Sequence, residues 1–285
     1  MSAVRPPGLL LPQWQGYAAG DGPQRGARAI AAALGDEERW HEVGVQPWHA
    51  LRSEEAAGEP GGPVLGLSEI AGHAAAARRW LDEVVPNRLL VIGGDCGSDV
   101  APMAWQAART GSDLGVLYLD AHADLNTPAS SPSGRFHGMV LRAALGEGAP
   151  ALAALCPRPL AAEQIVMAGT RELDGAERDF LEITGIRPWP PAAIEDGRVL
   201  AAVHAHRAKR WHVHFDLDVV DPADFPDVTV PAPGGPSFDA VTRLLVELVT
   251  HLDVVSLTVT EHVGGEASAR RVAGAIAALR RAGWS

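Results

Sequence analysis

Short runs of continuous apolar residues alternate with amphipathic stretches along most of the chain. The apolar runs at residues 89–92, 114–119, 164–168, 211–215 and 254–259 have the length and composition of buried strands. Helical spacing marks residues 24–34, 67–84, 238–252 and 266–282, and Ser68 is a candidate N-cap for the second of these. Strands that alternate with helices predict an α/β fold, a three-layer α-β-α sandwich around a mostly parallel central sheet.

The chain is expected to form a single domain over residues 1–285. This length is sufficient for one large hydrophobic core. The stretches at residues 54–63 and 188–192 are rich in Pro and Gly or acidic, but they are too short and too isolated to be domain linkers. No internal repeat is visible.

Composition and charge exclude several functional classes. A hydrophobic content of 47% excludes general disorder, and no stretch is long and apolar enough to span a membrane. A formal net charge of -11 disfavours nucleic acid and anionic membranes as partners. Two cysteines do not suit a disulfide scaffold. The first residues have too weak a charged region and too short an apolar region for a signal peptide. A cytoplasmic location is therefore expected.

Two clusters of potential metal ligands follow two of the predicted strands. Asp120, His122 and Asp124 recur with period two after the run at 114–119, and Asp216 and Asp218 follow the run at 211–215. An extended backbone would direct alternate side chains to the same side. Because parallel sheets bind ligands beyond the carboxyl ends of their strands, we expect the two clusters to converge.

Convergence of these carboxylates predicts bound cations. Carboxylates in a dry crevice repel one another unless positive charge neutralises them. Carboxylate-rich ligation with one imidazole suits Mn²⁺. Either cluster alone is also compatible with strand-end caps and turn formers, a common role of Asp, but the two together favour a metal site.

The sequence resembles the arginase or ureohydrolase family, whose members use two Mn²⁺ ions to hydrolyse guanidino compounds. The resemblance covers the segment between about residue 90 and residue 261, in family order. It rests on GGDCGS at 93–98, DAHADLNTP at 120–128, SGRFHGM at 133–139, GTRELDGAE at 169–177 and HFDLDVVDP at 214–222. It implies a two-metal centre that lowers the pKa of a shared water, and it implies that a homo-oligomer is possible.

The same resemblance implies a role for each metal ligand. Asp120 and Asp216 resemble the carboxylates that bridge the two metals. Asp124 and Cys96 stand at ligand positions of the first metal, and His122 and Asp218 resemble ligands of the second.

The main departure from the family is Cys96, which stands where the family carries a histidine. A thiolate is softer than imidazole and favours Zn, Fe or Cu over Mn, so the first site is weaker, takes a different metal, or is empty. Cys96 is also compatible with a small buried apolar residue. His214, two residues before Asp216, can supply a replacement imidazole, although a core histidine is the favoured role for it and for His212.

Three residues are implied to be catalytic. Asp124 resembles the carboxylate that shuttles a proton to the leaving amine. His137 resembles the histidine for proton transfer at the mouth of the site, a task suited to an ordinary pKa of roughly 6.5. Glu261 follows the strand at 254–259 and resembles the carboxylate that pairs with the substrate guanidinium. The alternatives are a structural loop histidine and an exposed glutamate.

The outer pocket bears on the substrate. The resemblance implies that an acidic pair, Asp174 and Glu177, recognises an α-amino group. It also implies that a second group contacts an α-carboxylate: Asn126, Ser131, Ser133 and Arg135. Arginine or N-hydroxyarginine therefore fits better than agmatine, which has no carboxylate. Val230 stands where arginases carry a threonine near the guanidinium, which with Cys96 suggests a substrate other than plain arginine.

The expected function is hydrolysis of a guanidino α-amino acid to urea, or to hydroxyurea from a hydroxylated substrate, with ornithine as the second product. Two alternatives remain: an agmatinase or guanidino-acid ureohydrolase, and a metal-poor arginase-like binding protein without activity. A single-zinc deacetylase shares the fold and an Asp-x-His pair, but Asp124 and Asp218 favour two metals.

Overall fold

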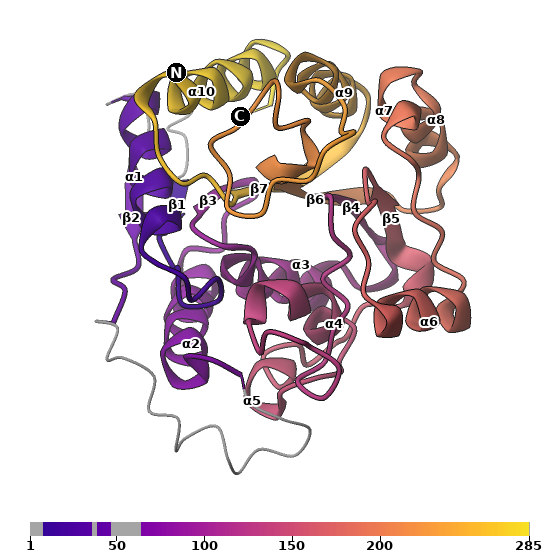
Figure 1. The fold of residues 1–285 in the computed structure, drawn as a ribbon. Helices are drawn as coiled ribbons and strands as arrows, with labels where there is room; N and C mark the ends of the chain where they lie inside the picture. Colours follow the sequence, from indigo (N-terminus) through magenta and orange to yellow (C-terminus); the bar gives the residue numbers. More distant parts are fainter. Residues whose placement is uncertain (1–7, 36–38, 47–63, 285) are drawn as a thin grey trace.

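Seven strands form one sheet through the middle of the molecule (Figure 1). The structure is a computed structural model that describes residues 8–35, 39–46 and 64–284. The strand order is β2-β1-β3-β7-β6-β4-β5, and every neighbouring pair is parallel, which confirms the predicted sheet. The strands are β1 (Gly8–Leu11), β2 (Trp40–Glu42), β3 (Leu89–Gly93), β4 (Leu114–Leu119), β5 (Ile165–Ala168), β6 (Arg210–Asp216) and β7 (Asp253–Thr260).

Helices cover both faces of the sheet and complete the predicted three-layer sandwich (Figure 1). One layer consists of α2 (Leu67–Val84), α3 (Val100–Thr110), α4 (Val140–Ala144), α5 (Pro150–Ala153) and α6 (Gly175–Thr184). The other consists of α1 (Gly22–Leu34), α7 (Ala192–Glu195), α8 (Arg198–Ala205), α9 (Phe238–His251) and α10 (Glu266–Arg281).

Each strand contributes to two hydrophobic cores, because successive side chains point to opposite faces. Leu9 and Leu11 of β1 pack in the core beneath α2 and α3, whereas Leu10 packs in the core beneath α1, α9 and α10. Burial on both faces explains why these strands are continuous apolar runs instead of alternating ones. No helix among the described residues is long and apolar enough to cross a membrane.

The helix boundaries differ from the sequence prediction in identifiable ways. The predicted N-cap role of Ser68 is wrong: α2 begins at Leu67 after Gly66, which has a left-handed backbone with φ 67°, so Ser68 lies within the first turn. Helix α1 begins two positions earlier than predicted, with Pro23 in its first turn, where a missing N–H has no consequence. The predicted loop at 54–63 lies outside the described residues. The loop predicted at 188–192 is correct until Ala192, where α7 begins.

The four central strands β3, β7, β6 and β4 are neighbours, so their carboxyl ends lie side by side. Asp216 at the end of β6 is paired with Thr260 of β7, and Phe215 is paired with Leu119 at the end of β4. The Glu261 N–H donates to the Gly94 carbonyl at 2.7 Å, which ties the end of β7 to the turn after β3. Four segments distant in sequence therefore meet at one edge of the sheet, as expected for a parallel α/β fold.

Candidate metal and catalytic site

Two groups of potential ligands converge at this edge of the sheet. In each group the residues can offer one ligand atom apiece, with all these atoms within 4.8 Å of one another. The first group is Cys96, Asp120, His214 and Asp216, and the second is Asp120, His122 and Asp218. Asp120 belongs to both, so the predicted convergence of the two strand tips is present in the structure.

The backbone reaches this arrangement by turns and not by the extended conformation that the period-two pattern suggested. Strand β4 ends at Leu119, and residues 217–219 form a short 3₁₀ turn. Asp120 Oδ1 accepts from the His122 N–H, and Asp216 Oδ1 accepts from the Asp218 N–H, each at 2.7 Å. A short acidic side chain that accepts from the backbone two residues later stabilises such a turn. The expectation of an extended backbone beyond the strands is therefore wrong, although both turns bring the side chains together.

The carboxylates of the cluster are not fully compensated by cations or hydrogen-bond donors of the protein. Burial, followed by the charge of Asp218, raises the pKa of Asp120 to about 6, and burial followed by the same charge raises the pKa of Asp216 well above its usual range. Asp120 Oδ2 is buried without a hydrogen-bond partner. Buried carboxylates are destabilising unless a cation or several donors compensate them. An orphaned carboxylate oxygen between two ligand groups thus fits divalent metal ions.

His122 provides part of the compensation. Its Nδ1 lies 3.0 Å from Asp218 Oδ2 and 3.5 Å from Asp120 Oδ1. Burial alone acts to lower the pKa of His122, but the charge of Asp218 and the hydrogen bonds to both carboxylates raise it to about 12. The imidazolium thereby takes the position of a cation beside these two aspartates.

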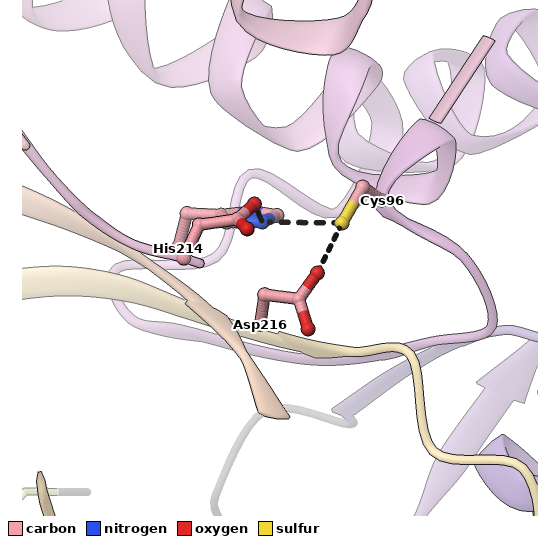
Figure 2. Close-up of side chains that lie close together, drawn as sticks. Cys96, His214 and Asp216 are labelled. Carbon is pink, nitrogen blue, oxygen red and sulfur yellow. Dashed lines mark hydrogen bonds and ion pairs between the residues drawn. The ribbon is translucent and has the colours of Figure 1, made fainter. Parts of the chain in front are cut away.

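Cys96 lies in the turn after β3, where Cys96–Asp99 form a short 3₁₀ helix. Its Sγ donates to Asp216 Oδ2 at 2.9 Å and lies 3.5 Å from His214 Nε2 (Figure 2). Burial, followed by the charge of Asp216, raises the pKa of the thiol well above its usual range. The buried thiol therefore borders both the ligand cluster and the apolar core beneath α2 and α3.

Asp124 lies beside the cluster but belongs to neither ligand group among the described residues. Its Oδ2 accepts from the Tyr118 hydroxyl at 2.6 Å, and its backbone is left-handed with φ 53°. A non-glycine residue at positive φ is strained, and such strain is concentrated at functional sites. Burial, followed by the charge of Asp120, raises the pKa of Asp124 well above its usual range.

Glu261 is the acceptor at the end of β7, is 1% exposed and has a left-handed φ of 68°. Its Oε1 accepts from the Cys96 N–H at 2.8 Å and lies 3.3 Å from His137 Nδ1, and its Oε2 accepts from the Thr229 hydroxyl. The hydroxyl on this carboxylate therefore comes from Thr229, which precedes Val230 in the sequence.

His137 borders the same carboxylate from a more exposed position, with 17% of its side chain accessible. Burial acts to lower its pKa, but the hydrogen bond and the charge of Glu261 outweigh burial, and the pKa lies above the ordinary value. Tyr17 packs edge-on against its ring at 5.7 Å. His137 is thus held between the buried cluster and the surface.

The predicted outer-pocket residues lie on two adjoining loops. Asn126 Nδ2 donates to Asp174 Oδ2 at 2.8 Å, which joins the two loops. Glu177 accepts from the Leu125 N–H and the Asp174 N–H, so both of its carboxylate oxygens have backbone donors. Glu177 is consequently a buried brace for the loop, whereas Asp174 is exposed.

Ser131, Ser133 and Arg135 form the second part of this rim. The Ser131 hydroxyl accepts from the Gly134 N–H at 3.0 Å and lies 3.5 Å from the Ser133 hydroxyl. The Arg135 guanidinium lies 5.5 Å from the centroid of the Tyr17 ring. Among the residues that the structure describes, no carboxylate forms an ion pair with Arg135.

Several residues of the site did not emerge from the sequence. Asp95 follows the Gly-Gly turn and accepts from Gln13 Nε2 and the Tyr17 N–H, and burial followed by the charge of Glu261 raises its pKa to about 7. Its place inside the GGDCGS stretch was an available signal. Asp99, which contacts His212 and His214, and Thr229, which donates to Glu261, could not be recognised from local sequence. An acidic residue in a turn and a threonine in a loop are common.

Comparisons with known proteins agree with this geometry. The model of the arginase family matches residues 13–279. The arginase of Bacillus caldovelox is 32% identical over 234 residues, which span 78% of this chain and 72% of that protein. The arginase of Brevibacillus brevis is 39% identical over 158 residues, or 52% of each chain. The structure of Entamoeba histolytica arginase with L-ornithine superimposes with a TM-score of 0.87 at 22% identity, covering 98% of this chain and 99% of that one. The chain therefore belongs to the arginase family.

Proposed function

We propose that this protein is a metal-dependent amidinohydrolase that hydrolyses the guanidino group of an arginine-like α-amino acid. The observation that carries the proposal is the pair of ligand groups that share Asp120, with the acceptor Glu261 beside them. The products are ornithine and urea from arginine, or ornithine and hydroxyurea from N-hydroxyarginine. The chain acts as one arginase-like domain.

The proposed metal centre uses the two ligand groups. Asp120, Asp216 and Cys96 would hold the first divalent ion, with Asp124 beside them, and Asp120, His122 and Asp218 would hold the second. Mn²⁺ is the expected ion of the second site, whose ligands are oxygen and one imidazole. When bound, the ions neutralise the buried carboxylates and lower the pKa of a water molecule enough for attack near neutral pH.

Glu261 orients the substrate in this proposal. Its carboxylate is held in place by the Cys96 N–H and the Thr229 hydroxyl, so little reorganisation is needed when a guanidinium arrives. A guanidinium presents a planar fork of donors, and a carboxylate is the acceptor that matches it. The electrophilic carbon is thereby placed next to the ligand groups.

Asp124 and His137 move the protons. Hydrolysis adds a water oxygen to the guanidinium carbon and breaks the bond to the amine. Both water protons leave the oxygen: the second ends on the freed amine, which becomes an ammonium, and the first must reach the leaving nitrogen for the bond to break. Asp124 lies beside Asp120 in the buried site and carries this proton. His137 is half-way to the surface, next to Glu261, and exchanges protons with solvent.

The rim supplies recognition of the α-groups. Arg135 has its guanidinium free of carboxylate partners among the described residues and binds the α-carboxylate, together with Ser131, Ser133 and Asn126. Asp174 contacts the α-ammonium, because its carboxylate is exposed at this rim. Glu177 acts through the loop that it braces.

Steady-state kinetics on four substrates test the proposal: arginine, N-hydroxyarginine, agmatine and guanidinobutyrate. Activity is expected on the first two and is expected to collapse when either the α-carboxylate or the α-amino group is missing. Arg135→Ala should raise KM for the α-amino acids. Arg109→Ala is a matched control, because Arg109 also stacks on an aromatic ring, Trp105, but lies on α3 away from the rim. Equal activity on agmatine and arginine would contradict the assignment.

A further inference from the structure

We propose that His214, held by Asp99, supplies the imidazole of the first metal position beside the Cys96 thiolate. The first position is then built from sulfur, nitrogen and two carboxylates and prefers Zn²⁺, whereas the second position retains a harder set that accepts Mn²⁺. This inference rests on the proposed two-metal function, but its test measures bound metal and not turnover, so the two can fail separately.

The candidate ligand atoms of the first position lie close enough together to bind one ion. His214 Nε2 lies 3.5 Å from Cys96 Sγ and 3.9 Å from Asp120 Oδ2, and Cys96 Sγ lies 2.9 Å from Asp216 Oδ2. Ligands of one tetrahedral zinc, bound at about 2.0–2.3 Å, lie about 3.3–3.8 Å apart. Figure 2 shows the imidazole edge, the sulfur and the carboxylate directed toward one another. Small side-chain shifts therefore suffice to bind one ion.

The hydrogen bonds of His214 leave the correct nitrogen available. Its Nδ1 lies 2.8 Å from Asp99 Oδ2. An ionised carboxylate only accepts hydrogen bonds, and the other oxygen of Asp99 already accepts from the Thr258 hydroxyl. Nδ1 of His214 must then carry the proton, and Nε2 presents its lone pair to the cluster. A carboxylate behind a metal-binding histidine is the usual arrangement that fixes ring orientation.

The ring is also fixed by its surroundings. Tyr118 stacks on His214 with centroids 4.1 Å apart and planes 7° from parallel. Thr258 donates to the second oxygen of Asp99 at 2.6 Å, and His212 Nε2 lies 2.9 Å from the first. His214 is fully buried, so its Nε2 has no access to bulk water. This rigid support fixes the ring with Nε2 directed toward the Cys96 sulfur, 3.5 Å away.

The unpartnered Asp120 Oδ2 is an independent indication that an ion belongs here. It is a buried oxygen without a hydrogen bond, and it faces His214 Nε2 at 3.9 Å. In contrast, Asp124, which family resemblance assigns to the first metal, has one oxygen taken by the Tyr118 hydroxyl. The imidazole that the family places at position 96 is thus relocated to β6, and a sulfur stands in its former place.

This ligand set determines the metal preference. Thiolate and imidazole are softer than carboxylate and favour Zn²⁺ over Mn²⁺, while Asp120, His122 and Asp218 at the second position suit a harder ion. The thiol of Cys96 loses its proton to solvent when the ion binds, because the ligand is the thiolate. No electron transfer is involved.

The direct test is X-ray absorption spectroscopy of the full chain loaded with one equivalent of Zn²⁺. The expected result is one sulfur at about 2.3 Å, and imidazole scattering from a nitrogen at about 2.0–2.1 Å. Co²⁺ at one equivalent should show a sulfur-to-cobalt charge-transfer absorption. A zinc spectrum with no sulfur ligand would overturn the proposal, and this result does not depend on any variant folding.

Variants separate the two ligands. Cys96→Ser should lose the charge-transfer band, and His214→Gln should keep the band but lose one imidazole and bind Zn²⁺ more than about 100-fold more weakly. Asp99→Asn should weaken binding about 10–100-fold, the range for a group that orients a ligand. Cys156→Ser and His73→Gln are matched controls, because both residues are buried outside the cluster, and these variants should leave zinc affinity and the charge-transfer band unchanged. Zinc binding by folded His214→Gln within about twofold of the parent would exclude His214 as a ligand.

Discussion

Asp120→Asn is expected to change the stability of the metal-free and metal-loaded protein in opposite directions. Asp120 is fully buried, and burial followed by the charge of Asp218 raises its pKa from 3.8 to about 6. A carboxyl that binds its proton more tightly when folded contributes stability that is fully present below pH 3.8 and is lost as the pH rises to about 6. Each tenfold difference in proton affinity corresponds to about 1.4 kcal/mol. Ionised Asp120 therefore destabilises the metal-free protein by up to about 3 kcal/mol above pH 6.

The variant removes this penalty because the amide has no charge. Its carbonyl oxygen can still accept from the His122 N–H, and its amide nitrogen takes the place of Oδ2, 3.9 Å from His214 Nε2. In EDTA at pH 7.5 the variant should be more stable by up to about 3 kcal/mol, which raises Tm by roughly 6–12 °C. With Zn²⁺ or Mn²⁺ present the order should reverse, since a ligand that binds only the folded state stabilises it according to its affinity, and the variant lacks the shared carboxylate.

Urea and thermal unfolding, followed by far-ultraviolet circular dichroism, provide the measurement. The difference in unfolding free energy between variant and parent should be small at pH 4, grow between pH 4 and 6, and remain constant above pH 6. Asp179→Asn in α6 is the control, because Asp179 is exposed. If Asp120→Asn is less stable than the parent in EDTA at pH 7.5, or if the difference does not vary with pH, the description of the cluster as uncompensated buried charge is wrong.

Four further changes have defined outcomes. Glu261→Gln should lower kcat/KM for arginine by about 100-fold or more, because the amide cannot neutralise a guanidinium; a loss below threefold in folded protein would remove Glu261 from the site. His137→Asn should lower kcat by about 100-fold with little effect on KM, as measured by urea release, if His137 transfers protons. Burial outweighs the Val43 hydrogen bond and lowers the pKa of His73 to about 4; the parent should therefore lose up to about 3 kcal/mol of stability as the pH falls from 6.5 to 4, and His73→Gln should flatten this part of the pH profile. Cys96→His should raise the Mn²⁺ content relative to Zn²⁺ by elemental analysis, and an unchanged ratio would show that the thiol is not a ligand.

Local patterns in the sequence predicted most of the strands and helices. The central strands β3, β4, β6 and β7 are apolar runs because both of their faces are buried, so each was predicted to within a few residues. Strand β1 was not predicted, although it lies between β2 and β3 in the sheet. Its four residues are too few to show any periodicity, and only pairing with its neighbours defines it.

The same division applies to the site. The kinds of ligand at positions 120, 122, 216 and 218 were readable, because each cluster is contiguous in sequence and follows a recognisable strand, and parallel strands end at one edge. The imidazole facing Cys96 comes from a residue 118 positions away, and the hydroxyl on Glu261 comes from one 32 positions away. Contacts of this kind depend on strand order, register and side-chain rotamers, which appear only when the whole sheet is assembled. The sequence alone therefore specified a parallel α/β sandwich with a cluster of metal ligands. Tertiary packing decided that Thr229 donates to Glu261 and that the imidazole facing the Cys96 thiol comes from His214.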